Sequence, residues 1–401
     1  MVRMSRVAVG AACLLVAGML TACSGVAGSP TAGELDVRTL EVGPYPVDRH
    51  KYEQNSSGKG AVLEGIRMAD AVPPTVKIDP SLIHGRGNTV FTDIDTAVDF
   101  LANVSAPILE KRKMVAGYAA SGADQADPDG STRPASGTTA ITTVVLRFPD
   151  ESAAKSAAKE LEDADISVSP DNRKLLSTKY PDAFLHWRPG VANVGAFHAY
   201  KSFVISLFVA RPRADSTDLI SWVDKTLAVQ TSVLDTFQPT PADKLDSLNV
   251  DPDGMLARVA VQERKEHEPD PQKFAAYGPN HFVHDSEDEG RAIKLLESTG
   301  VDKTAHVSAS SVFRARDEAA AQQLIPGLIT EAGDKFDSIS APDDVPGAKC
   351  LRLNSKGDSE RDYKYRCYVQ YKRYVGLVTS DKEPDVRQKV AAQYALLANS
   401  L

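Results

Sequence analysis

The amino-acid sequence predicts an α+β protein made of two tandem related units, each an antiparallel sheet with packed helices, behind a signal peptide and a short tether. Strand and helix patterns recur in the same order in both halves, several helices begin after an Asp, and the connections are local rather than βαβ crossovers. We expect the first α+β unit over residues 39–246 and the second over residues 247–401.

The N-terminus has the features of a secretory signal. Arg3 and Arg6 precede the apolar run Val7–Leu20, which at about 14 residues is too short to span a bilayer comfortably. The sequence Leu20-Thr21-Ala22-Cys23 resembles the lipobox of bacterial lipoproteins at all four positions. It predicts a signal peptide over residues 1–22 and a lipid anchor on Cys23. The alternative is ordinary Ala-Xaa-Ala cleavage beside an incidental Cys.

Residues 23–38 are then the lipidated Cys and a flexible tether rich in Gly, Ser, Ala and Pro. This predicts a protein at the extracytoplasmic face of the cell membrane, which it contacts as a partner through its lipid anchor. The chain has 46 Lys and Arg against 54 Asp and Glu. Since two of the basic residues lie in the signal, the processed chain carries 44 − 54 = −10. An acidic body argues against nucleic acid as a partner.

The first correspondence between the halves pairs Gly87–Asp93 with Pro279–Asp285. Each segment ends in an Asp that can cap a following helix. The buried faces of those helices are expected to match, with Leu101 and Val104 corresponding to Ile293 and Leu296.

The second correspondence pairs Val145–Glu151 with Val312–Glu318, a period-two strand that runs into an Asp-started helix. The apolar helix positions are Ala153, Ala154, Ala157 and Leu161 in the first copy and Ala320, Ala321, Leu324 and Leu328 in the second. Pro326 is expected to break or kink the second helix. The first copy also has about 25 extra residues near Ser121–Gly137, whose composition predicts a loop.

The third correspondence is a hairpin, Tyr200–Ile205 and Tyr371–Gly376, followed in each copy by a long closing helix. The apolar stripes of these helices are Ile220, Val223 and Leu227 in the first, and Val386, Val390, Tyr394 and Leu397 in the second. Pro384 suits the first turn of the second closing helix.

Two of the four cysteines remain for a disulfide, because Cys13 leaves with the signal and Cys23 is lipidated. Cys350 and Cys367 lie on the predicted strands Lys349–Asn354 and Tyr363–Tyr371, and a turn between them would place the two opposite each other. We expect a structural disulfide, since no C-x-x-C motif supports a redox function. The matching positions of the first copy are near Leu185 and Ala196.

The sequence contains only weak matches to known catalytic and metal-binding motifs. Ser152–Lys155 and Ser156–Lys159 match S-x-x-K, but the partner motifs of penicillin-binding proteins are absent, and a solvated helix face explains them. His281, His284, Asp285 and His267 could suggest a metal site, although strand alternation would place His281 and His284 on opposite faces. Asp93–Asp95 and Asp285–Glu289 could bind calcium, but helix capping is simpler. We therefore predict no catalytic residue, no metal and no cofactor.

Aromatic and basic residues interleave over Tyr363–Tyr374, and Trp187 occupies the matching hairpin of the first copy. Rings beside positive charges could stack on sugars or bind an anionic glycan, or they could form an amphipathic hairpin with one buried face. We favour the hairpin.

The N-terminal region resembles a known family through Gly33–Leu40, Val42–Pro46 and Glu64–Asp70. These segments are similar to cell-envelope lipoproteins of mycobacteria, nocardiae and rhodococci that form a family of unknown function. The resemblance implies an envelope location and gives no information about an activity, a cofactor or a catalytic residue.

We expect a non-enzymatic lipoprotein that binds an envelope ligand or a protein partner, in the groove between its units. One alternative is a hydrolase or transferase acting on envelope glycans or lipids, which a nucleophile–base–orienter set would favour. Another is a sensory or accessory subunit of a membrane complex, which an exposed apolar patch would favour.

Overall fold

The computed structural model describes residues 35–128, 134–265 and 267–401. The predicted signal peptide and Cys23 lie outside these residues, as do residues 129–133 of the predicted loop. Residues Val37–Leu401 form one compact unit. No helix in the described part of the chain is both long enough and apolar enough to cross a membrane.

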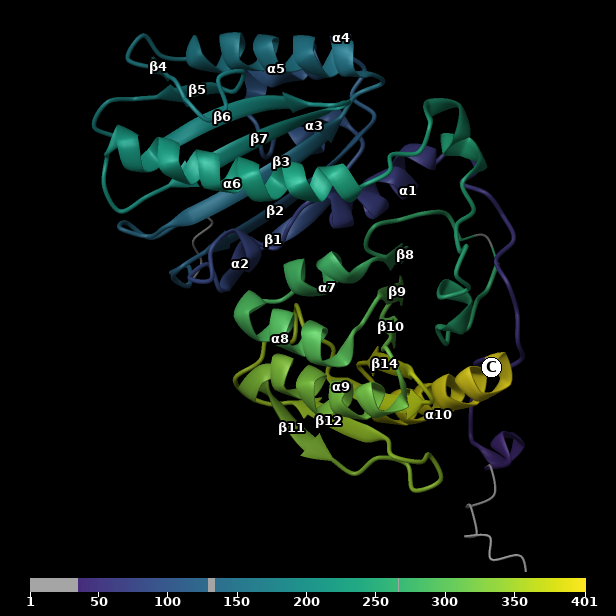
Figure 1. The fold of residues 1–401 in the computed structure, drawn as a ribbon. Helices are drawn as coiled ribbons and strands as arrows, with labels where there is room; N and C mark the ends of the chain where they lie inside the picture. Colours follow the sequence, from purple (N-terminus) through teal and green to yellow (C-terminus); the bar gives the residue numbers. More distant parts are fainter. Residues whose placement is uncertain (1–34, 129–133, 266) are drawn as a thin grey trace, which may run out of the picture. The chain divides into compact units, whose positions relative to one another are not determined.

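Two seven-stranded antiparallel sheets organise the chain (Figure 1). The first half contains η1 (Val37–Thr39), α1 (Gly60–Arg67), η2 (Met68–Ala71), α2 (Thr75–Ile78), β1 (His84–Phe91), α3 (Ile94–Ala97), η3 (Asn103–Ser105), α4 (Ala106–Lys111), β2 (Ala116–Ala123), β3 (Ala140–Arg147), α5 (Glu151–Ile166), β4 (Arg173–Leu175), β5 (Phe184–Trp187), β6 (Asn193–Tyr200), β7 (Phe203–Ala210), α6 (Ser216–Thr236) and η4 (Ala242–Ser247). The second half contains η5 (Leu256–Arg258), β8 (Phe274–Tyr277), α7 (Pro279–His284), α8 (Glu289–Thr299), β9 (Lys303–Val307), β10 (Ser310–Arg314), α9 (Glu318–Glu331), η6 (Gly333–Lys335), β11 (Phe336–Ile339), β12 (Lys349–Leu353), β13 (Tyr365–Tyr371), β14 (Tyr374–Ser380) and α10 (Glu383–Ser400).

The two sheets have the same topology, which confirms the α+β class and the duplication. The strand order is β1-β2-β3-β7-β6-β5-β4 in the first sheet and β8-β9-β10-β14-β13-β12-β11 in the second. Each strand therefore has an equivalent in the other copy. The helices α5 and α9 follow equivalent strands, and α6 and α10 follow the last strand of each copy.

The register agrees at the level of single residues. Arg147 pairs with Phe203 in the first sheet, and Arg314 pairs with Tyr374 in the second. The predicted matches Val145 with Val312, Leu161 with Leu328 and Tyr200 with Tyr371 all fall on equivalent elements. Both hairpin turns also contain a Lys with positive φ, 53° at Lys201 and 48° at Lys372. The third correspondence is confirmed, and Pro384 lies in the first turn of α10 as expected.

The Asp caps of the second correspondence are confirmed. The Asp150 carboxylate accepts a hydrogen bond from the Ala153 amide, and Asp317 accepts one from the Ala320 amide, both at 2.8 Å. Of the predicted break or kink at Pro326, the break is wrong, since α9 continues to Glu331, and the kink stays a prediction. Buried side chains on both sides of the proline, including Leu324 and Leu328, hold the helix against the sheet and offset the lost backbone bond.

The first correspondence is wrong in its structural details. Gly87–Phe91 belongs to strand β1, whereas Pro279–His284 forms helix α7, because a proline in the first turn favours helix and cannot donate to a sheet. The equivalent of β1 is β8. Asp93 does cap α3, but Asp285 follows α7, and Asp288 caps α8 instead. Leu101 lies outside any helix and Val104 is exposed in η3, whereas Ile293 and Leu296 lie on α8.

Cys350 and Cys367 form a disulfide between directly opposed positions of β12 and β13. At the equivalent positions of the first sheet, Leu185 is opposite Ala196, and both are buried. The first copy thus has a buried apolar pair where the second copy has the disulfide, as the sequence predicts.

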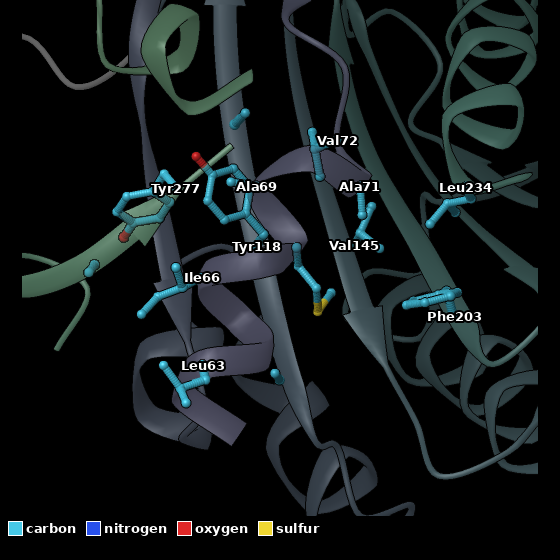
Figure 2. Packing of buried hydrophobic residues seen from close by; sticks show 14 of the residues in the cluster. Leu63, Ile66, Ala69, Ala71, Val72, Tyr118, Val145, Phe203, Leu234 and Tyr277 are labelled. Atoms are coloured by element: carbon cyan, nitrogen blue, oxygen red, sulfur yellow. The ribbon is translucent and has the colours of Figure 1, made fainter. Parts of the chain in front are cut away.

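The core is shared between the halves. One buried cluster combines residues of the α1–η2 segment, such as Ile66, with Tyr118 and Val145 of the first sheet and Tyr277 of the second half (Figure 2). Separate apolar clusters fill the layers under α5 and under α9. The boundary near residue 246 stays a prediction.

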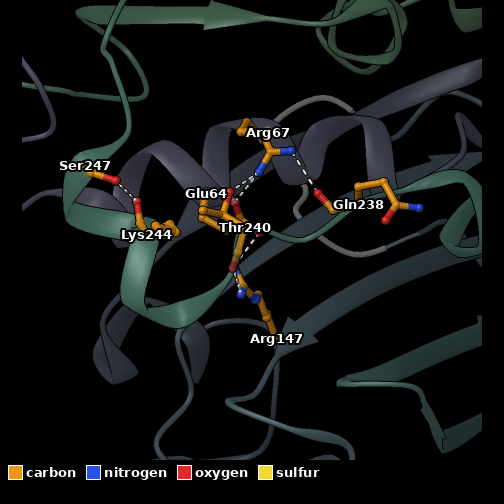
Figure 3. Close-up of polar contacts among 7 residues, drawn as sticks. All are labelled: Glu64, Arg67, Arg147, Gln238, Thr240, Lys244 and Ser247. Carbon is orange, nitrogen blue, oxygen red and sulfur yellow. Dashed lines mark hydrogen bonds and ion pairs between the residues drawn. The ribbon is translucent and has the colours of Figure 1, made fainter.

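Glu64 of α1 sits in a buried polar network (Figure 3). Its fully buried carboxylate lies 2.5 Å from Nη1 of Arg147 on β3 and 2.6 Å from Nη1 of Arg67. It also accepts hydrogen bonds from the Thr240 hydroxyl at 2.7 Å and the Thr240 amide at 3.1 Å. This network joins α1 and the segment after α6 to the sheet.

Candidate functional site

A buried polar cluster lies where α7 meets the first sheet. Tyr118 of β2 donates a hydrogen bond from its hydroxyl to Asn88 Oδ1 at 3.0 Å. The same hydroxyl lies 3.3 Å from His281 Nδ1 and 3.0 Å from His284 Nδ1. Our expectation that the two histidines occupy opposite strand faces is wrong: they are one turn apart on α7 and share a helix face.

Burial keeps this cluster uncharged at neutral pH. It lowers the pKa of His284 to about 3 and that of His281 well below its usual value, and it raises the pKa of Tyr118 well above its usual value. Within the described ranges, no group of three or more His, Cys, Asp or Glu side chains is arranged to hold a metal ion. His267 stacks on Phe274 instead of joining the α7 histidines.

Glu289, the first residue of α8, reaches across to the first half. Its Oε2 accepts hydrogen bonds from the Thr75 hydroxyl and the Val76 amide of α2, both at 2.9 Å. The side chain is 1% exposed, and burial raises its pKa to about 7.

Glu289→Gln should remove a pH-dependent component of stability. Because the folded pKa of about 7 exceeds the unfolded value of 4.5, folding takes up a proton between these values, and stability is lost as pH rises through this window. The loss is up to about 3 kcal/mol. We expect the wild-type free energy of unfolding, relative to the variant, to fall between pH 4.5 and 7. Urea denaturation across this range measures it. The buried histidines are common to both proteins, so parallel pH profiles would contradict the prediction.

A cavity of about 480 Å³ lies between the second sheet and α7–α9. Strands β9, β10, β13 and β14 line one side, and the helices and η6 line the other. Its apolar surface comes from Phe282, Ala292, Phe313, Leu328, Ala332 and Leu377. Its polar surface includes Thr304, His306, Ser311, Glu331, Lys335, Arg366 and Tyr368.

The duplication provides an internal comparison for the sheet wall of this cavity. His306 and Ser311 are opposed on β9 and β10, and their equivalents on β2 and β3 are Ala119 and Val144. Thr304 likewise takes the place of Gly117. Ala119 and Val144 are buried in the apolar cluster under α5. The second copy therefore has polar side chains at positions where the first copy has buried apolar side chains.

The polar groups of this wall are only partly satisfied within the protein. His306 Nδ1 lies 2.8 Å from Ser311 Oγ, whereas His306 Nε2 and Thr304 Oγ1 are buried without a hydrogen-bond partner among the described residues. Burial also lowers the pKa of His306 to about 4, so the imidazole is neutral. Buried polar groups are normally paired, so these atoms are available to a ligand.

A second cavity, of about 320 Å³, adjoins the first. His281, Asp285 and His306 line both cavities, and the second extends to Asn88 and Thr89 of β1. The candidate site thus borders the junction between the halves.

The other sequence candidates have structural roles. Lys155 pairs with Glu151 and Lys159 with Asp163 on the exposed face of α5. In the Tyr363–Tyr374 segment, Tyr365, Tyr368 and Tyr374 are buried, whereas Tyr363 is 44% exposed. Trp187 donates from Nε1 to the Val191 carbonyl at 2.6 Å.

Sequence reasoning missed Thr304, His306 and Ser311, and it placed Arg366 in the Tyr363–Tyr374 segment, for which we favoured an amphipathic hairpin. Their signal was present in the repeat alignment, because His306 and Ser311 stand where Ala119 and Val144 stand in the first copy. A polar residue at a position that is apolar in the other copy marks a departure from simple core packing.

No curated protein matches the chain. Among solved structures, the chain is similar to the extracellular domain of PknH from Mycobacterium tuberculosis, with 8% identity and a TM-score of 0.29, over 40% of this chain and 93% of that one. At this score the likeness supports no conclusion about fold or function. The N-terminal model of the domain of unknown function DUF7373 matches residues 51–250, and the C-terminal model matches residues 255–400. The chain therefore belongs to the DUF7373 family and carries both of its domains.

Proposed function

We propose that the protein is an extracytoplasmic lipoprotein, anchored to the cell membrane through Cys23, that binds a small envelope molecule in the cavity beneath α9. The supporting observation is the exchange of the apolar Ala119 and Val144 for the polar His306 and Ser311 at equivalent positions of the two sheets. A volume of about 480 Å³ is within the range of small-molecule sites. The proposed ligand position is inside the second half, whereas the sequence led us to expect a groove between the units.

The second candidate is a hydrolase, favoured by the Ser311 hydroxyl next to an imidazole nitrogen. Two features make this pair a weak catalyst. The lowered pKa of His306 makes it a poor base, and no carboxylate in the described chain orients its Nε2. Covalent labelling of Ser311 by a fluorophosphonate would favour the hydrolase over the binding protein.

The double variant His306→Ala with Ser311→Val tests the binding site, because it installs the residues of the first copy. Binding of envelope small molecules should weaken by about tenfold or more as the polar partners are lost, a change of about 1.4 kcal/mol or more. Native mass spectrometry of full-length protein extracted from membranes measures the bound species. His198→Ala, which removes a buried histidine of the first sheet, is the control and should keep the ligand. Equal ligand occupancy in the double variant and wild type would refute the site.

Cys23→Ala should release the protein from the membrane fraction, because one lipidated thiol is the proposed anchor. Carbonate washing of membranes followed by immunoblotting measures this, and Ser24→Ala is the control. Variant protein that resists the wash would rule the anchor out.

A further inference from the structure

We propose that the ligand of this cavity is a small organic acid whose carboxylate binds Arg366 while its apolar part packs against Phe313 and Leu328. The inference rests on the proposed function and adds the ligand's chemical class. It depends on the contacts of Arg366 and on what the first copy places at the equivalent position.

Arg366 lies at the cavity wall, against the Phe336 ring. Its Cζ lies 3.7 Å from the centre of the Phe336 ring, and its side chain is 16% exposed. Nε is buried without a hydrogen-bond partner among the described residues, and Nη2 makes a 3.4 Å contact with Asp362. The Arg366 side chain also hydrogen-bonds the Tyr368 side chain. Nε and Nη2 form one edge of the guanidinium group, which is the edge that binds a carboxylate through two hydrogen bonds.

In the first copy, the side chain that occupies this place is paired with carboxylates of the same copy. Gly195 is the equivalent of Arg366, and His186 is directly opposite it, as Leu351 is opposite Arg366. The His186 ring lies over Gly195, where an added Cβ would be 2.6 Å from Nε2. His186 Nδ1 lies 2.7 Å from Glu162, and its Nε2 lies 3.5 Å from Asp165. Desolvation lowers the pKa of His186, but the hydrogen bond with Glu162 and the charges of Glu162 and Asp165 together outweigh it, so the pKa is raised and the imidazole faces two carboxylates of α5.

The second copy lacks those two carboxylates. Since the caps Asp150 and Asp317 correspond, the positions of Glu162 and Asp165 on α5 are those of Ile329 and Ala332 on α9. Ala332 lines the cavity. A positive charge thus faces apolar helix positions in the second copy, and a ligand carboxylate can take the place that Glu162 holds in the first.

The ion pairs around the cavity leave a surplus of positive charge near Arg366. Lys335 and Arg366 share the single carboxylate of Asp362, at 3.2 and 3.4 Å. Two other carboxylates line this end: Asp334 pairs with Lys356, and Glu331 accepts a hydrogen bond from Ser286 at Oε2. Glu331 Oε1 lies 3.7 Å from Arg291 Nε and has no hydrogen-bond partner among the described residues. Glu287, which also lines the cavity, is exposed, so solvent screens its repulsion of an anion. Asp285 lines the cavity too, and desolvation raises its pKa to about 6.

The test compares carboxylic acids with their own primary amides. A panel of aliphatic and aromatic acids, each paired with the amide of the same carbon skeleton, is titrated into full-length protein at pH 7 by calorimetry. The acid should bind about tenfold tighter than its amide, as expected for a charge-assisted contact. Arg366→Gln should reduce this ratio to about one. Arg314→Gln, which removes a paired arginine outside the cavity lining, should keep the ratio.

The outcomes separate this inference from the proposed function. Amides that bind wild-type protein as tightly as the acids, or a preference that survives in Arg366→Gln, would overturn the carboxylate assignment and leave the cavity as a binding site. If no acid and no amide binds, the cavity itself is refuted as a site for such molecules. Should Arg366→Gln fail to fold, Arg366→Lys and the comparison of acid and amide on wild type still decide the ligand class.

Discussion

Replacing Glu64 with alanine should lower the free energy of unfolding by about 3–5 kcal/mol, because it leaves a buried guanidinium without its carboxylate. Arg147 is 4% exposed, and Glu64 is its only ion-pair partner among the described residues. The same substitution removes the acceptor of the Thr240 hydroxyl and amide. Urea denaturation followed by circular dichroism measures the change.

The second copy supplies the control for this prediction. Arg314 is the equivalent of Arg147, but its partner Asp302 is 55% exposed, so Asp302→Ala should cost less than about 1 kcal/mol. A comparable loss of stability in Glu64→Ala and Asp302→Ala would show that burial does not set the strength of the first network.

Replacing Cys350 and Cys367 together with alanine should lower the free energy of unfolding by about 3 kcal/mol, because the disulfide restricts the unfolded chain. The two residues are 17 positions apart and both are buried. Denaturation of the oxidised wild type and of the variant, under the same non-reducing conditions, gives the difference.

A second variant separates the crosslink from packing. Cys350→Leu with Cys367→Ala installs the pair that the first sheet carries at Leu185 and Ala196. It should recover part of the packing energy and stay less stable than oxidised wild type, since the unfolded chain is no longer restricted. A stability equal to that of oxidised wild type would mean that the bond adds nothing beyond filling the space.

Local sequence patterns were sufficient to predict the repeated helices and strands. Asp150 and Asp317 identify helix starts because an N-cap side chain bonds a backbone amide only three residues further along the chain. The strand that ends at Arg147 is recognisable because its apolar residues alternate with period two. The Cys350–Cys367 pairing follows from the register of one hairpin, which the repeat also fixes at Leu185 and Ala196. In each case residues close in sequence carry the information.

Long-range packing decided what local patterns could not. Pro279–His284 resembles a segment that forms a strand in the other copy, yet it folds as a helix whose histidines meet Tyr118, 163 and 166 positions away. The cavity depends equally on distant residues, since His306 and Arg366 lie on different strands and line it together with residues of α7, α8 and α9. Whether a polar side chain at a core position finds a partner depends on which helix covers it, and that is set only when the sheet and its helices pack together.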